Sequence, residues 1–194
     1  MEQMVTGVVL AGGSSRRMGR DKAMMPLQGR PIIERIIQTM DEIFERTIII
    51  AQAHQDLSLY GRQVVHDLVP GFGALMGLYT GLKKSPTWRV LAVACDMPFI
   101  QPGLLSYMCS VDHPADVIVP KINGHFEPLL AIYSKSCLPA IEELIGKSDK
   151  SILSLYPKVT VREITQEEIE LSDPEQKSFI NINTRQEYFK SVGN

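Results

Sequence analysis

Four basic side chains are crowded into residues 16–22, which two serines separate from a pair of glycines. They are Arg16, Arg17, Arg20 and Lys22, and with Asp21 among them the local charge is +3. Glycines that follow a strand let backbone N–H groups approach an anion, and adjacent cations neutralise phosphate oxygens. The alternative for Gly12–Gly13 is an ordinary turn that carries solvated arginines. The combination of glycines and cations favours a phosphate-binding loop.

Two carboxylates stand at the ends of other apolar runs. Asp96 follows the run 89–95, and Asp67 follows the run 63–65. A carboxylate at the end of a buried strand is costly unless it is paired, and Mg²⁺ bound to a substrate phosphate is one such partner. Alone, Asp96 is equally well explained as an N-cap, and Asp67 better explained as a turn former. Together with the basic loop, they predict a nucleotide–Mg²⁺ site.

Several familiar site patterns are absent from the sequence. Five residues separate Gly13 from Gly19, and Arg20 follows, so the loop does not have the Walker A spacing. Neither the dinucleotide fingerprint nor the Gly-x-Ser-x-Gly elbow occurs, and the histidines lack metal-ligand spacing. The segment Gly73–Leu78 leaves two interpretations open, which are a helix N-terminus that faces an anion and glycines that allow close helix–sheet packing.

The elements that must position these residues alternate between strands and helices. Apolar strands are expected at 6–10, 47–51, 63–65, 89–96, 116–120, 129–133 and 159–164. Helices are expected from Pro31 onward and at 74–84, 103–109, 135–145 and 151–155, and a capping box predicts another after Thr165. This alternation predicts an α/β, Rossmann-like three-layer sandwich with a mostly parallel central sheet. Ligands of such sheets bind beyond the carboxyl ends of the strands.

The composition is that of a globular protein. Of the 194 residues, 44% are hydrophobic and 22% charged, and we expect a single domain over residues 1–194. The net charge of −2 argues against nucleic-acid and membrane-surface binding. Three cysteines without paired spacing suit a reducing compartment, and no apolar run is long enough to span a bilayer. We therefore expect a cytoplasmic protein.

Five motifs, in order along nearly the whole chain, resemble those of the molybdenum cofactor guanylyltransferase family. The first is the glycine-and-cation loop at 10–22, followed by Leu-x-Gly-x-Pro at 27–31. The others are Gly73–Leu78, the Cys-Asp-Met-Pro of 95–98, the Glu-Pro-Leu of 127–129 with Ala-Ile-Tyr at 131–133, and the Asn-Ile-Asn-Thr of 181–184. An ordered set of this kind is far more specific than any single motif.

The resemblance implies a nucleotide-diphospho-sugar-transferase type of fold and the transfer of GMP from GTP to molybdenum-bearing molybdopterin. It implies GTP contacts at Leu10, Ala11, Gly12, Gly13, Lys22, Asp67 and Asp96, with Mg²⁺ on Asp96. Asn181 and Asn183 would lie near the metal or the acceptor, although Asn183 could instead cap a last helix. The acceptor phosphate would attack the α-phosphorus in line, while Arg17 and Lys22 stabilise charge on the leaving pyrophosphate. Transient contacts with other cofactor-biosynthesis proteins are also implied.

Two positions depart from the family pattern. The chain has Gln52 where the family often has Asn, and Ala74 where it usually has Pro. Three other functions stay open at this point. They are a cytidylyltransferase acting on the same pterin, a nucleotidyltransferase acting on another small phosphate, and a non-catalytic module that delivers a nucleotide or cofactor. The glycine pair disfavours the first, Asn181–Asn183 the second and Asp96 the third.

Overall fold

The computed structural model describes residues 5–12, 22–53, 55–69 and 71–182. Its main sheet has the strand order β10-β7-β9-β6-β1-β4-β5, and a short strand β8 pairs with β7. The strands are β1 (Val5–Leu10), β4 (Thr47–Ala51), β5 (Gln63–His66), β6 (Arg89–Ala94), β7 (Val117–Ile122), β8 (His125–Phe126), β9 (Leu130–Ser134) and β10 (Val161–Ile164). A separate two-stranded ribbon joins β2 (Pro26–Leu27) to β3 (Arg30–Pro31).

Strand β1 lies at the point where the order of the sheet reverses. It pairs in parallel with β4 on one side and with β6 on the other. The chain proceeds from β1 to β4 and β5, and then crosses back to add β6 at the opposite side of β1. A crevice forms at the carboxyl ends of the strands at such a switch point, so this order predicts where a ligand binds.

The sheet departs from a purely parallel arrangement at β9. This strand lies between β6 and β7 and is antiparallel to both. The preceding turn explains the reversal, because Asn123 (φ 49°) and Gly124 (φ 78°) have the positive φ angles of a two-residue hairpin turn between β7 and β8. The expectation of a mostly parallel sheet is confirmed, with β9 inserted antiparallel between β6 and β7 and the short β8 paired antiparallel to β7.

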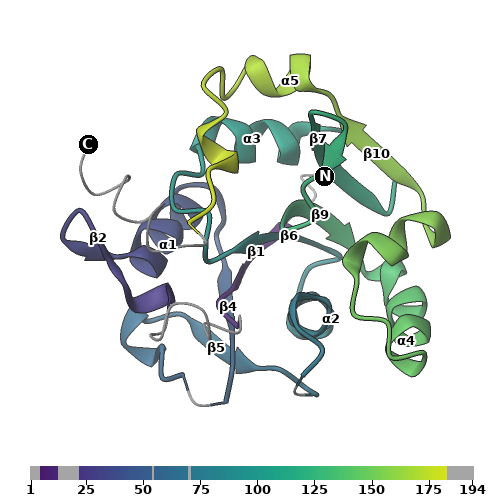
Figure 1. Ribbon diagram of the computed structural model, residues 1–194, viewed down its shortest axis with the longest axis horizontal. Helices are drawn as coiled ribbons and strands as arrows, with labels where there is room; N and C mark the ends of the chain where they lie inside the picture. The colour runs from purple at the N-terminus through teal and green to yellow at the C-terminus, as the bar shows by residue number, and fades with distance from the viewer. Residues whose placement is uncertain (1–4, 13–21, 54, 70, 183–194) are drawn as a thin grey trace.

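Helices cover both faces of the sheet (Figure 1). One face carries α1 (Ile32–Ile43), α3 (Pro102–Ser110) and α5 (Gln166–Glu170), and the other carries α2 (Ala74–Lys84) and α4 (Leu138–Gly146). Short 3₁₀-helices stand at Lys22–Met24, Ser58–Tyr60, Lys135–Cys137, Ile152–Lys158 and Lys177–Phe179. Alternate residues of β1 point to opposite layers, since Val8 packs under α2 and Val9 under α1. The expected three-layer sandwich is confirmed.

Two predictions about helix packing and capping are answered by the structure. A Cβ on Gly81 would lie 2.9 Å from Val8 Cγ1, and one on Gly77 would lie 3.1 Å from Leu10 Cδ2. The glycines of α2 therefore permit its close approach to β1.

The capping box is also present, because the Thr165 side chain accepts a hydrogen bond from Glu168 N while the Glu168 carboxylate accepts one from Thr165 N.

Candidate functional site

The ends of three central strands are held together by backbone hydrogen bonds. Ala11 N donates to Ile50 O (2.8 Å), which continues the β1–β4 ladder beyond Leu10. Cys95 N donates to Leu10 O (3.1 Å) and does the same between β1 and β6. Gly12 follows at once and is partly exposed, so the glycine loop begins where β1, β4 and β6 end side by side.

Asp67 lies against this first glycine. A Cβ on Gly12 would stand 3.6 Å from Asp67 Oδ2 and 3.4 Å from Gln52 Cγ. Asp67 N donates to Ala51 O (3.3 Å), which anchors the residue just after β5 at the end of β4. The predicted nucleotide-binding residues Gly12 and Asp67 therefore share one small space, and the substituted Gln52 borders it.

The carboxyl group of Asp67 lacks the partners that burial normally demands. Its Oδ1 atom is buried and accepts no hydrogen bond from the described residues. Burial raises the pKa of Asp67 to about 6, although the neighbouring charge of His66 acts in the opposite direction. A buried acceptor without a partner is costly, so this carboxyl is well placed to receive a donor from a ligand.

Asn181 is brought to Asp96 by the C-terminal segment. Ile182 N donates to Asp96 O (2.9 Å), and Asn181 Oδ1 is buried without a partner among the described residues. The segment is fixed upstream by Asp173, a buried carboxylate that accepts hydrogen bonds from Lys177 N (2.9 Å) and Ser178 N (2.8 Å). The predicted pair of Asp96 and Asn181 thus meets at the end of β6.

Glu127 is a partly buried residue that the sequence analysis did not place in the site. Burial raises the pKa of the Glu127 carboxyl and the negative charge of Asp96 raises it further, whereas a hydrogen bond from Leu129 N acts against them. That bond joins Leu129 N to Glu127 Oε1 over 3.3 Å. The two residues are linked through the strand pairing, because Ala94 N, two residues before Asp96, donates to O of Leu129 (2.9 Å), two residues after Glu127. The motif Glu-Pro-Leu was visible in the sequence, but the proximity to Asp96 depends on the strand pairing.

Gln55 is another residue that the sequence analysis missed. Its buried side chain connects two loops of the site, because Oε1 accepts from Gln52 N (2.8 Å) and Nε2 donates to Ala11 O (3.3 Å). The thiol of Cys95 approaches the same carbonyl oxygen at 3.9 Å. No sequence signal identified Gln55, because a lone glutamine after a strand is typical of an exposed turn.

The remaining predicted site residues cannot be placed in the same way. Gly13, Arg17 and Asn183 lie outside the described residues. Lys22 is the first residue of the 3₁₀-helix Lys22–Met24, and its side chain is also outside the described part. The expectation that the cations bind phosphate therefore stays a prediction. Leu10, Ala11 and Gly12 follow one another at the end of β1, Gly12 lies against Asp67, and Asp96 is bonded to Ile182, the residue after Asn181.

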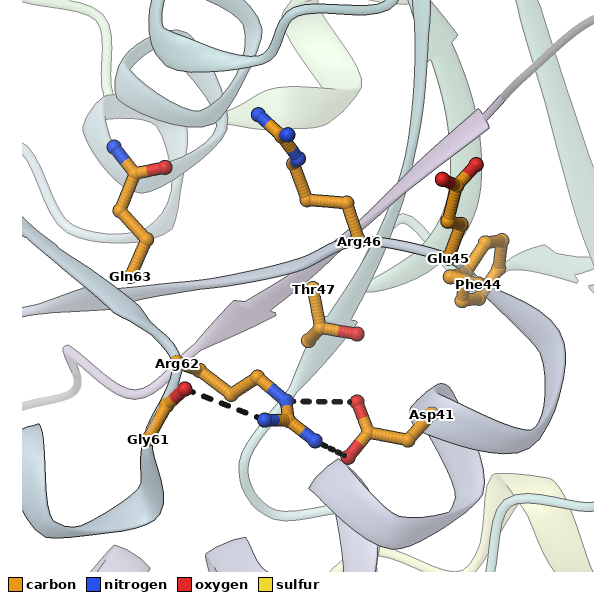
Figure 2. A pocket seen from close by; sticks show the side chains of 8 residues that line it. All are labelled: Asp41, Phe44, Glu45, Arg46, Thr47, Gly61, Arg62 and Gln63. Carbon is orange, nitrogen blue, oxygen red and sulfur yellow. Dashed lines mark hydrogen bonds and ion pairs between the residues drawn. The ribbon is translucent and has the colours of Figure 1, made fainter.

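A polar hollow of about 500 Å³ lies at the opposite, amino end of β4 and β5. Figure 2 shows its lining side chains, in which Arg62 reaches across to Asp41. None of the predicted site residues lines it. Its lining residues are Asp41, Phe44, Glu45, Arg46, Thr47, Gly61, Arg62 and Gln63.

The donor set at the carboxyl edge fits a hard divalent cation. Asp96 and Glu127 offer carboxylate oxygens and Asn181 an amide oxygen, which are the ligands that Mg²⁺ takes alongside substrate phosphates. Among the described residues, no group of three or more His, Cys, Asp or Glu side chains could hold a metal by itself. A cation here would therefore depend on a few protein oxygens and on a phosphate ligand.

Within the described residues, no helix has the length and apolar character needed to cross a bilayer.

The sequence profile of the MobA-like NTP transferase domain matches residues 7–161, which include the ends of β1, β4, β5 and β6. The chain belongs to this family. It is a nucleotidyltransferase, and an α/β sheet of this kind binds its ligand at the carboxyl ends of the strands, at the switch point.

Relatives of this MobA-like chain match it over almost its entire length. A "probable molybdenum cofactor guanylyltransferase" of Pelotomaculum thermopropionicum is 37% identical over 96% of this chain and 91% of its own. The molybdenum cofactor guanylyltransferase of Desulfosudis oleivorans is 34% identical over 96% and 94%. The crystal structure of molybdopterin-guanine dinucleotide biosynthesis protein A from Archaeoglobus fulgidus has a TM-score of 0.87, with 28% identity over 97% of both chains.

Proposed function

We propose that this protein transfers GMP from GTP to the molybdopterin cofactor, forming a guanine dinucleotide and releasing pyrophosphate. The observation that carries the proposal is the set of polar groups at the carboxyl ends of the central strands. Asp67 Oδ1 and Asn181 Oδ1 are buried without partners in the described residues, and the carboxylates Asp96 and Glu127 flank the paired strands β6 and β9, Asp96 after β6 and Glu127 before β9. GTP and molybdopterin as substrates are supported by the names of its relatives, which specify a guanylyltransferase of the molybdenum cofactor and the biosynthesis of a molybdopterin-guanine dinucleotide.

Each part of the site has a role in this reaction. The backbone at Leu10, Ala11, Gly12 and Gly13 binds GTP, because amide groups after a strand suit an anion. Arg17 and Lys22 neutralise its phosphates and the pyrophosphate that leaves. Asp67 accepts a hydrogen bond from the nucleoside, since its buried Oδ1 lacks another donor in the described chain. These assignments account for the basic loop and for the orphaned carboxyl together.

The acceptor side lies around Asn181 and Asn183. Asn181 stands beside Asp96 because Ile182 N is bonded to Asp96 O, so an acceptor bound here meets the metal ligand. The acceptor phosphate oxygen attacks the α-phosphorus of GTP, a P–O bond forms to it, and the bond to the β-phosphate oxygen breaks. Pyrophosphate leaves with the bonding electrons. No side-chain nucleophile is needed, so the residues act by positioning and charge neutralisation.

We infer that the divalent cation of the site is Mg²⁺, held by Asp96 with the oxygens around it. Members of this class of transferase work on a metal-bound nucleotide, and the oxygen donors fit a hard cation. When bound, such a cation neutralises phosphate charge and orients the reacting oxygens.

The domain is proposed to span residues 1–194, since β10 continues the sheet beyond the matched segment. A cytoplasmic location and transient contacts with other cofactor-biosynthesis proteins stay predictions.

The nucleotide preference tests this function directly. Purified protein with molybdopterin and Mg²⁺ is expected to release pyrophosphate faster with GTP than with ATP, CTP or UTP. If CTP were the better substrate, the protein would be a cytidylyltransferase and the role of the Gly12–Gly13 pair in selecting guanine would be wrong. If GTP were consumed only with another phosphorylated acceptor, the proposed pterin substrate would be wrong.

A further inference from the structure

We propose that Glu127 is a second carboxylate ligand of the divalent cation, opposite Asp96. This inference rests on the proposed function, because it concerns the metal of the same reaction. It adds a residue outside both the glycine loop and the C-terminal segment, because Glu127 lies in the short segment between β8 and β9.

The pairing of β6 with β9 brings the two carboxylates together. Val93 lies opposite Leu130, and Ala94 N donates to Leu129 O (2.9 Å), so the ladder runs to the last residue of β6. In an antiparallel pair, each step forward along one strand is a step back along the other. The chain then turns at Cys95–Asp96 and at Pro128–Leu129, so Asp96 lies two residues after Ala94 and Glu127 two residues before Leu129, at the same end of the paired strands.

The backbone around Glu127 is held on three sides. Glu127 N donates to Pro120 O (3.0 Å) at β7, and Leu130 N donates to Glu127 O (3.2 Å). The fully buried Tyr133 donates from its hydroxyl to Pro128 O (2.7 Å). Such support fixes the direction in which the side chain leaves the backbone, which is what a metal ligand requires.

The charge balance around Glu127 calls for a cation. Two carboxylates close together and partly withdrawn from water repel each other, and a positive charge between them relieves that repulsion. No lysine or arginine in the described part of the chain forms an ion pair with Glu127, and the nearby Lys121 is instead paired with Glu163 (3.0 Å). Asn181 Oδ1 is buried without a partner among the described residues, and Asn181 precedes Ile182, whose N–H donates to Asp96 O (2.9 Å).

A purely structural role for Glu127 makes a different prediction. Its Oε1 accepts from Leu129 N (3.3 Å), so the side chain could serve only to close the turn between β8 and β9. The variant E127Q keeps an oxygen acceptor for that N–H but removes the negative charge. E163Q is the matched control, because Glu163 is an exposed carboxylate on β10 that pairs with Lys121.

The test measures Mn²⁺ binding by electron paramagnetic resonance, with a non-hydrolysable GTP analogue bound to the full chain. We expect Mn²⁺ affinity to fall by at least about tenfold in E127Q and in D96N and to stay unchanged in E163Q. Binding of the analogue without metal is expected to be unchanged or tighter in E127Q, because a negative charge near the phosphates has been removed. If E127Q fails to fold, E127D replaces it, and its withdrawn carboxylate is expected to weaken Mn²⁺ binding as well.

The outcomes separate this inference from the proposed function. Unchanged Mn²⁺ affinity in folded E127Q, alongside loss in D96N, would overturn the role of Glu127 and leave the proposed function standing. If the wild-type protein with the GTP analogue bound no Mn²⁺, both would be overturned. Loss in E127Q, with native thermal stability in the absence of metal, supports Glu127 as a ligand.

Discussion

The polar groups at the two ends of the central strands differ in whether they have hydrogen-bonding partners within the protein. At the amino end, Arg62 donates two hydrogen bonds to Asp41, from Nε to Oδ1 (3.0 Å) and from Nη2 to Oδ2 (2.5 Å) (Figure 2). At the carboxyl end, Asp67 Oδ1 and Asn181 Oδ1 are buried and have no partner in the described residues. At the amino end the two charged side chains pair with each other, whereas at the carboxyl end two buried oxygens have no donor among the described residues.

This difference shows that a hollow alone does not mark the site. The amino-end hollow is roomy, but its ion pair is complete and partly exposed. Its Thr47 Oγ1 is buried without a partner among the described residues, yet a neutral hydroxyl costs less to bury than a carboxylate. Unpaired buried oxygens beside a glycine loop are costly for folding, and they are retained where a ligand supplies the missing donors.

The largest effect is expected at Asp96. D96N removes the charge that we assign to the metal, so pyrophosphate release should fall by at least about a hundredfold. D112N is a suitable control, since Asp112 is an exposed carboxylate in the loop after α3. Steady-state pyrophosphate assays at saturating GTP measure both. Turnover of D96N at the wild-type rate would show that Asp96 holds no essential metal.

Asp67 should show opposite effects on binding and on stability. Its folded pKa of about 6 lies above the value of 3.8 usual for an aspartate, so the native state holds this proton more tightly than the unfolded state. The contribution of Asp67 to stability is therefore present at low pH and is lost as the pH rises from about 4 to 6. D67N removes this penalty, and we expect it to stabilise the protein by about 1 to 2 kcal/mol at pH 7.5.

The same variant should weaken GTP binding by about tenfold, because an amide offers the nucleoside a weaker acceptor than a carboxylate does. Urea denaturation at pH 4.5 and 7.5 measures the first effect, and calorimetry with a GTP analogue the second. A D67N protein that is less stable than wild type at pH 7.5 would mean that the carboxylate has a partner in the free protein.

Gln55 should affect substrate binding more than turnover. Q55M preserves the length of the side chain but removes its hydrogen bonds to Gln52 N and Ala11 O. Since these bonds set the spacing of the two loops, we expect KM for GTP to rise about three- to tenfold, at a stability cost of about 1 to 2 kcal/mol. Q38M is the control, because Gln38 makes its hydrogen bonds on the surface of α1. An unchanged KM in Q55M would assign Gln55 a structural role only.

The smallest effect is expected at the amino end. D41N breaks the ion pair with Arg62, but both side chains are about a third exposed, at 29% and 38%. Exposed pairs contribute less than about 1 kcal/mol, so thermal stability should change little and pyrophosphate release not at all. A large loss of activity in D41N would mean that the two ends of the sheet are coupled, which contradicts the division between them.

Strongly patterned elements were predictable from the sequence. The run Thr47–Ala51 is entirely apolar or β-branched and is a fully buried strand, and the helix Ala74–Lys84 begins and ends at the predicted residues. Asp67 and Asp96 were found for the same reason, because polar residues after apolar runs mark strand ends. Their convergence with Gly12 followed from the rule that parallel strands end at one edge.

The features that the sequence did not reveal depend on pairing in three dimensions. The β9 run predicted a strand, but its insertion between β6 and β7 is set by tertiary contacts rather than by its residues. Glu127 was hidden for this reason, because its approach to Asp96 follows from the antiparallel register. Gln55 was missed because its hydrogen bonds to Ala11 and Gln52 form only once the fold brings these residues together.

The most direct test of the account follows both products of one reaction. Purified protein is incubated with GTP, Mg²⁺ and molybdopterin, and the guanylylated pterin is measured by mass spectrometry while pyrophosphate is measured in the same samples. If the protein transfers GMP to the pterin, the two products form in equal amounts and neither forms when molybdopterin is omitted. Binding of GTP without formation of either product would contradict this transfer and would make the protein a nucleotide-binding module.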